Sequence, residues 1–150
     1  MIRNVKVSLL LAQFVQEAQG LVNMIGGGIT VMGPDPSPVA IAGAIELPWD
    51  AAGVQHQIRF ELIDSEGQPV LGPSAEGGEV PIVVEGHFDV APAPGTKRGT
   101  PLTFPIALNL PPQPIPPDGR YEWRLYVDGE THEDWRLGFT TRPAVQSNVA

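Results

Sequence analysis

Residues 119–128 read Gly-Arg-Tyr-Glu-Trp-Arg-Leu-Tyr-Val-Asp and alternate between two kinds of side chain. In an extended strand, successive side chains point to opposite faces. One face then includes Tyr121, Trp123, Leu125 and Val127, and the other includes Arg120, Glu122, Arg124 and Asp128. The pattern predicts a strand with one face in a hydrophobic core and one face in water.

The segment after this strand indicates how the strand pairs. A second odd-numbered apolar row follows it and comprises Trp135, Leu137 and Phe139. If both rows face one core, residues that oppose each other must have numbers with an even sum. A two-residue turn at Asp128-Gly129 would instead set Val127 against Glu130 and bring an acid beside the core. We therefore expect an odd-length loop or a bulge within residues 128–134.

The same alternation recurs along the chain. It covers residues 5–11, 39–49, 57–62, 81–90 and 102–110, and residues 21–32 read as a further strand. Helical spacing appears only between Leu11 and Gly20, where we expect one short helical turn. The chain has 17 Gly and 17 Pro, which suits short strands joined by turns. The sequence predicts an all-β fold, an antiparallel immunoglobulin-like β-sandwich of about eight strands with at most one short helical turn.

Length and composition bound the class of protein. A chain of 150 residues fits one domain, which we assign to residues 1–142, with a C-terminal tail at 143–150. A net charge of −8 has the wrong sign for gripping phosphate backbones, so we expect no nucleic-acid partner. No apolar run approaches the roughly 20 residues that span a bilayer, so we expect a soluble protein with no membrane partner. Without cysteine, the chain has neither disulfides nor thiolate metal sites.

Large side chains of the predicted strands are assigned to the core, because buried aromatic residues supply much of a core's area. They are Trp49, Phe60, Phe104, Tyr121, Trp123, Leu125, Trp135 and Phe139. The consecutive Gly26, Gly27 and Gly28 indicate a bulge or a sharp strand bend. The alternative is a phosphate cradle, but that needs a Lys and a Ser or Thr opening a helix, a pattern that Ile29-Thr30-Val31 does not provide.

The sequence nominates no catalytic, cofactor or metal site. His56, His87 and His132 lie far apart on different predicted strands or loops, and no recognised zinc spacing is present. The chain also has no Gly-x-Ser-x-Gly nucleophile elbow and no calcium-loop pattern. We therefore expect a protein that is not an enzyme and binds no cofactor, with an unrecognised hydrolase as the remote alternative.

Two proline-rich segments are candidate interaction sites. Residues 91–101 hold three prolines, two glycines and a basic pair, which is typical of a mobile loop. Residues 111–117 have polyproline II character and are either a rigid crossover between sheets or a groove ligand for another protein. We favour the crossover, because the segment lies between two core strands. The candidate interaction residues are Pro94, Lys97, Arg98, Pro112, Pro114, Ile115 and Pro116.

Three motifs carry a resemblance to a known family. They are Ala12-Gln13, the run Gly-Leu-Val-Asn-Met-Ile-Gly-Gly-Gly at 20–28, and the closing Gly119-Arg120-Tyr121 to Val127-Asp128-Gly129. With these motifs the chain resembles a domain-of-unknown-function family associated with actinobacteria and their phages. The resemblance implies no functional residues. Small immunoglobulin-like sandwiches of this kind are similar to accessory proteins on virion surfaces, which is an analogy of fold.

These observations favour a non-enzymatic structural or interaction module. Its most concrete form is a phage capsid-associated, minor capsid or decoration protein that contacts other protein subunits, either coat protein or further copies of itself. We expect it in the virion if a phage encodes it, and otherwise in the cytoplasm. The alternative is an intracellular bacterial ligand-binding β-sandwich with a pocket near the Gly26 to Gly28 bend or the loop at 91–100.

Overall fold

The computed structural model describes residues 4–144. Within these residues the fold is all-β apart from one 3-10 turn at Trp49–Ala51, so the expected fold class is confirmed. Of the tail expected at 143–150, residues 145–150 lie outside the described residues.

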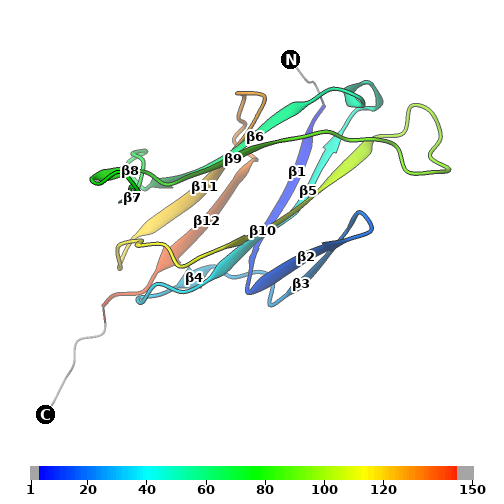
Figure 1. The fold of residues 1–150 in the computed structure, drawn as a ribbon. Coiled ribbons are helices and arrows are strands. Elements are labelled where there is room, and N and C mark those ends of the chain that lie inside the picture. Colours follow the sequence, from blue (N-terminus) through cyan, green and yellow to red (C-terminus); the bar gives the residue numbers. More distant parts are fainter. Residues whose placement is uncertain (1–3, 145–150) are drawn as a thin grey trace, which may run out of the picture.

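Two sheets face each other across a hydrophobic core and form a sandwich (Figure 1). The first sheet comprises β1 (Lys6–Ala12), β5 (Val39–Leu47) and β10 (Leu102–Leu110), in the order β1-β5-β10. The second comprises β4 (Val31–Met32), β6 (His56–Asp64), β9 (Val83–Phe88), β11 (Arg120–Val127) and β12 (Arg136–Thr141). Its order is β4-β12-β11-β6-β9, and β4 runs parallel to β12 while the other neighbours in both sheets are antiparallel.

The crossover between the sheets has a feature of immunoglobulin-like sandwiches. Residues 111–117 lead from β10 in the first sheet to β11 in the second, so the predicted crossover is confirmed. At its end, the Tyr121 hydroxyl donates a hydrogen bond of 2.9 Å to the Pro116 carbonyl, as in the tyrosine corner of that fold. The Thr141 hydroxyl donates to the same carbonyl at 2.9 Å and ties β12 to the crossover. Burial raises the pKa of Tyr121, which keeps its hydroxyl a donor.

The core between the sheets draws on strands of both. It buries four of the predicted core residues, namely Phe60, Trp123, Leu125 and Phe139. The other four pack against it while partly exposed, namely Trp49, Phe104, Tyr121 and Trp135. Trp123 is only 1% exposed, so the alternation along residues 121–127 does reflect one buried face.

The β11–β12 hairpin reaches the expected register by a route that we did not predict. Opposed residues along the ladder have numbers with an even sum, as for Trp123 and Leu137. The tip is nonetheless a regular two-residue turn at Asp128 (φ 51°) and Gly129 (φ 79°). Between this turn and the ladder, residues 131–135 oppose two residues of β11. The two-residue turn contradicts the odd-length loop that we expected at the tip. Three extra residues within 131–135 restore the register instead, as the alternative of a bulge would.

The helical turn expected between Leu11 and Gly20 is wrong. The chain forms a hairpin of β2 (Phe14–Ala18) and β3 (Leu21–Ile25), joined by a two-residue turn at Gln19 (φ 54°) and Gly20 (φ 77°). Positive φ at both turn positions matches the twist of the flanking strands. The helical spacing of apolar residues gave a wrong prediction because this hairpin is apolar on both faces. Such a hairpin lacks the alternation that marks a strand.

Two further segments complete the fold. Gly26, Gly27 and Gly28 follow β3 and bend the chain toward β4, with φ of 64° at Gly26 and 100° at Gly28, a region that favours glycine. A small hairpin of β7 (Leu71–Pro73) and β8 (Glu79–Pro81) precedes β9.

Candidate functional site

The β2–β3 hairpin forms an extra layer on the outer face of the first sheet (Figure 1). Beneath it lies a second small core built from Ala12, Val15, Ala40 and Ala42, with Val22 and Ala107 packed against it. Val15 is 1% exposed. Alanine side chains on β5 and β10 leave room for a third layer to approach the sheet closely.

Asn109 on β10 fixes the position of the hairpin. Its Nδ2 donates a hydrogen bond of 2.8 Å to the Val15 carbonyl, and its Oδ1 accepts one of 3.1 Å from the Val15 N–H. A side-chain amide carries the same donor and acceptor as a peptide unit. Asn109 therefore acts on β2 as a neighbouring strand would act at one residue.

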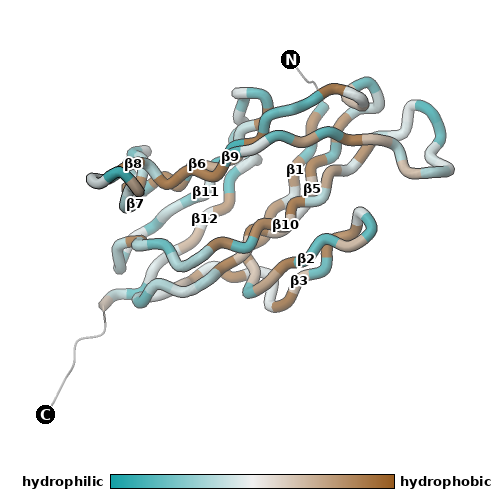
Figure 2. The backbone as a smooth tube through the Cα atoms, viewed as in Figure 1, coloured by the Kyte–Doolittle hydropathy of each residue, from teal (hydrophilic) through white to brown (hydrophobic). Residues whose placement is uncertain are grey.

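The surface of the hairpin is apolar. Of the nine large hydrophobic residues exposed in the described chain, five lie in residues 10–25. We call them the hairpin surface: Phe14, Leu21, Met24 and Ile25 on the hairpin, and Leu10 on β1. Leu21 is 67% exposed and Ile25 is 62% exposed. Figure 2 shows hydrophobic segments along both β2 and β3.

The hairpin is also nearly free of charge. Residues 13–28 contain one charged side chain, Glu17, in a chain in which 17% of residues are charged. The Glu17 carboxylate accepts a hydrogen bond of 2.8 Å from the Gly20 N–H and so serves the turn. Depletion of charge together with aromatic and Met residues is the compositional mark of a protein–protein interface core.

The outer face of the second sheet has the opposite character. Arg124 and Arg136 place their Nε atoms 3.1 and 3.4 Å from the Glu122 carboxylate, and Arg59 pairs with Glu61 at 2.6 Å. A face of paired charges is well solvated and needs no cover. The uncovered apolar surface is therefore on the hairpin side of the sandwich.

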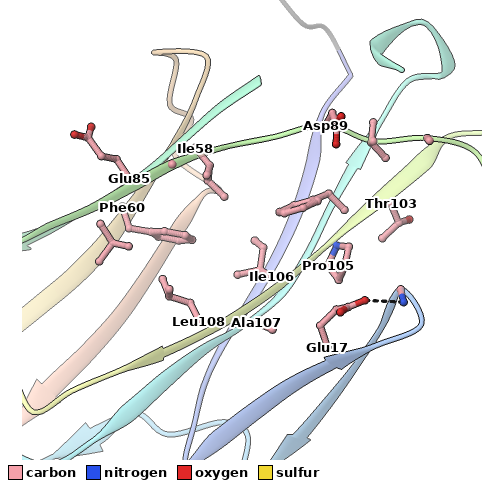
Figure 3. Close-up of a pocket in the computed structure, with 16 residues that line it drawn as sticks. Glu17, Ile58, Phe60, Glu85, Asp89, Thr103, Pro105, Ile106, Ala107 and Leu108 are labelled. Atoms are coloured by element: carbon pink, nitrogen blue, oxygen red, sulfur yellow. Dashed lines mark hydrogen bonds between the residues drawn. The ribbon is translucent and has the colours of Figure 1, made fainter. Parts of the chain in front are cut away.

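A cleft of about 610 Å³ opens beside β10 (Figure 3), and we call it the edge cleft. Its apolar walls come from β6, β9 and β10, and comprise Ile58, Phe60, Val84, Phe104, Ile106 and Leu108. Acidic side chains lie around it, namely Glu17, Glu85 and Asp89. β9 and β10 are each the last strand of their sheet on this side. The edge cleft therefore lies where none of the strands in residues 4–144 closes the sandwich.

An ion pair between buried His56 and exposed Asp128 lies outside both surfaces. His56 is 4% exposed, with Nδ1 2.9 Å from the Asp128 carboxylate and Nε2 2.8 Å from the Ala51 carbonyl. Burial lowers the pKa of His56, but the hydrogen bonds to Ala51 and Asp128 and the charge of Asp128 outweigh burial and raise it. Because both partners are acceptors, the imidazolium satisfies both. The pair ties the 3-10 turn to the β11–β12 turn, which is a structural task.

The structure does not gather the candidate interaction residues predicted from the sequence. Pro94, Lys97 and Arg98 lie exposed in the loop before β10, whereas Pro112, Pro114 and Pro116 lie exposed after it. The nine residues of β10 separate the two groups by about 30 Å. Ile115, the remaining candidate, is partly buried and packs against the core.

Sequence reasoning missed the hairpin surface. The available signal was the Gln19-Gly20 pair between two five-residue stretches, since a glycine at the second turn position is typical of tight hairpins. The edge cleft reaches Ala91 at the start of the predicted mobile loop. Gly26 to Gly28, the other expected pocket position, are not among its lining residues.

The described residues offer neither a metal-binding cluster nor a membrane-spanning helix. Residues 4–144 contain no group of three or more His, Cys, Asp or Glu side chains that could hold a metal ion. In the same part of the chain, no helix is long and apolar enough to cross a membrane.

Comparison with known proteins gives one family. Neither the curated proteins nor the solved structures include a match to this chain. Residues 7–140 match the model of a family of unknown function, DUF6941. The matched span contains the hairpin surface, the edge cleft and nearly all of the sandwich. The chain therefore belongs to the family of unknown function DUF6941.

Proposed function

We propose that this protein is a non-enzymatic structural and interaction module that binds other protein subunits through the hairpin surface. The observation that supports the proposal most is that four of the nine exposed large hydrophobic residues of the described chain lie on one nearly uncharged hairpin. Covering a side chain such as Phe14, Leu21 or Ile25 contributes about 1.5–3 kcal/mol when burial is complete. Contiguous exposed apolar surface on a folded domain is typical of an interaction site.

The setting that we propose is a phage virion, where the protein would act as a capsid-associated, minor capsid or decoration protein. Two observations support this setting. The sequence motifs resemble a family associated with actinobacteria and their phages, and the immunoglobulin-like sandwich is similar to accessory virion proteins. Both are analogies, so the partner subunit is to be identified by experiment.

Native mass spectrometry of the untagged protein from its own source tests the proposal. We expect a mass above the 16.0 kDa of one chain, from self-association or a bound coat subunit. The triple variant Phe14→Ser, Leu21→Ser, Ile25→Ser should lose the association, because it removes the apolar surface and leaves the inner face of the hairpin intact.

The matched control alters three exposed apolar residues elsewhere, namely Val54, Leu71 and Val80, each to Ser. It should keep the association. Circular dichroism of both triple variants verifies that they fold. A bare monomer from the native source, or equal loss of binding in both variants, would overturn the proposal.

A ligand-binding sandwich is the second candidate, and the edge cleft is the observation that favours it. Its volume of about 610 Å³ is in the range of small-molecule pockets, and its walls are mainly apolar. Pro105 lacks an N–H and lies in the edge strand beside the cleft, so addition of a peptide strand there is disfavoured. An uncharged apolar molecule fits the walls best.

Binding of the neutral dye Nile red measures this second function. Gly86 lines the cleft opposite Ile58, and a Cβ there would meet no atom within 4 Å, so Gly86→Trp introduces a large side chain at the wall of the cleft. His87→Trp is the control, because neighbouring strand residues face opposite ways. We expect dye binding in the wild type and His87→Trp, and its loss in Gly86→Trp. Equal binding by all three proteins would exclude the cleft as the site.

A further inference from the structure

The β3 strand has a free edge, and we propose that it pairs there with β3 of a second copy of this chain. The inference rests on the proposed function, because it names a second copy as the partner subunit and uses β3, which carries Leu21 and Ile25 of the hairpin surface. Among the described strands, β3 is hydrogen-bonded to β2 alone. Proteins commonly protect such edges with Lys or Pro, as Pro105 does in β10. The sequence Leu-Val-Asn-Met-Ile of β3 has neither.

The contacts of β2 show which backbone groups of β3 face outward. Val15 directs its N–H and C=O to Asn109, away from β3. Met24 opposes Val15 in the register and therefore directs its own N–H and C=O to the other edge. Val22, two residues away, does the same because backbone direction alternates along a strand. Two residues of β3 thus offer two donors and two acceptors to a neighbour.

These groups are self-complementary about Asn23. Consider two β3 strands that pair antiparallel about a two-fold axis at Asn23. Val22 of each copy then lies opposite Met24 of the other copy. Each of the two pairs exchanges both hydrogen bonds, which gives four in total. The contact is isologous, so it closes as a dimer rather than growing into a fibre.

Side chains select this register over its neighbours. On the outer face, Leu21 lies opposite Ile25 of the second copy, and Asn23 lies opposite Asn23. If the second strand slid by two residues in either direction, the polar Asn23 would lie opposite the apolar Leu21 or Ile25. If it slid by one residue, the outer side chains of one copy would lie beside the inner side chains of the other. The chosen register joins Phe14 and Ile25 of one copy to Leu21 of the other in one apolar stripe.

Charge sets how the pairing responds to salt. Each copy carries a net charge of −8, so two copies repel at long range, while residues 13–28 bring only Glu17 to the contact. Salt screens the repulsion over a Debye length of about 8 Å at physiological ionic strength. We expect the dimer to strengthen as salt concentration rises.

Sedimentation velocity on the full chain tests whether the dimer forms through the edge of β3. Met24→Pro removes an outward N–H without removing a bond to β2, and its ring obstructs a neighbouring strand. We expect the dissociation constant of the dimer to rise about tenfold or more. Met24→Ala is the control, because it trims the side chain and keeps the backbone donor, and it should still dimerise.

Cysteine crosslinking tests the register and does not depend on the proline variant folding. The chain has no cysteine, so Asn23→Cys introduces a single thiol. At a non-hydrogen-bonded pair the two Cα atoms lie about 4.5 Å apart, within the range for a disulfide. Mild oxidation should give a covalent dimer. Gln16→Cys, on β2 opposite Asn23, lies one strand from the axis and should not crosslink.

The outcomes separate this inference from the proposed function. A dimer that Met24→Pro weakens and Asn23→Cys traps supports the β3 pairing. A dimer that Met24→Pro leaves intact overturns it. A chain that is monomeric alone but carries a different subunit, lost in the Phe14, Leu21 and Ile25 variant, also overturns it and leaves the interaction module in place. A chain with no partner of either kind overturns both.

Discussion

Gly43 lies in the middle of β5, where the backbone of β1 passes so close that a Cβ would overlap the Ser8 carbonyl oxygen. We expect Gly43→Ala to lower the free energy of unfolding by about 3 kcal/mol, because the two strands must move apart. Urea denaturation measures the change. Gly86→Ala is the control, since open space surrounds that position, and it should change stability by less than about 1 kcal/mol. Similar losses in both variants would contradict the close approach.

His56 makes stability depend on pH with a definite sign. Its pKa is raised above 6.5 in the folded chain, so folding favours the protonated ring. The stabilisation is complete below about pH 6.5 and is lost as pH rises through the raised value. Asp128→Asn should flatten this decline in the free energy of unfolding as the pH rises above 6.5, because it removes the negative charge.

Urea denaturation across that pH range, with His56 followed by NMR, measures the effect. His132→Gln is the control, because His132 is exposed and should leave the decline unchanged. A stability that rises with pH in this window, or a His56 that titrates below 6.5, would refute the assignment.

At the scale of elements, the β2–β3 hairpin depends on one amide of β10. Asn109→Ala leaves the N–H and C=O of the buried Val15 without partners, which costs about 1–3 kcal/mol. The loss is local, so hydrogen exchange at the Val15 amide should speed up while exchange at Trp123 is little changed. Asn109→Asp keeps the acceptor for the Val15 N–H, so the exchange rate of the Val15 amide should lie between those of the wild type and Asn109→Ala. Uniform acceleration at both amides would show that the hairpin unfolds only with the whole domain.

The elements that could be predicted from the sequence are those with one wet face. Trp123 and Leu125 alternate with charged residues, and the odd-numbered rows even required the bulge before β12. The hairpin of β2 and β3 was not predicted, because Val15 packs inward while its neighbour Phe14 is also apolar but points outward. A strand that keeps an apolar outer face for a partner does not show the alternation by which strands are identified.

For the whole molecule, a single main core joins both sheets, and we expect one cooperative unfolding transition. Trp49, Trp123 and Trp135 all belong to or pack against that core. Thermal unfolding followed by tryptophan fluorescence and by far-UV circular dichroism should therefore give coincident curves. Separate midpoints would indicate that the sheets unfold independently.

The walls of the candidate sites could not be predicted from the sequence, because they are formed by segments that are far apart in the chain. The edge cleft exists because, among the described strands, none closes the side of the sandwich between β9 and β10. The sequence indicated a pocket near the loop at 91–100, but it did not indicate the walls of the cleft on β6, β9 and β10. What a loop leaves uncovered depends on strands far away in the chain. The same holds for the proline segments, which were grouped by composition although the length of β10 separates them.

The bond between Asn109 and Val15 spans 94 residues, and this separation has a consequence for the growing chain. At about 5–20 residues per second, the ribosome adds Asn109 some 5 to 20 s after Val15. The hairpin itself can form within microseconds, long before the strand that will hold it exists. If β3 pairs as we propose, two nascent chains on neighbouring ribosomes of one messenger RNA can pair through their β3 edges. Dimer assembly then begins before either chain is complete.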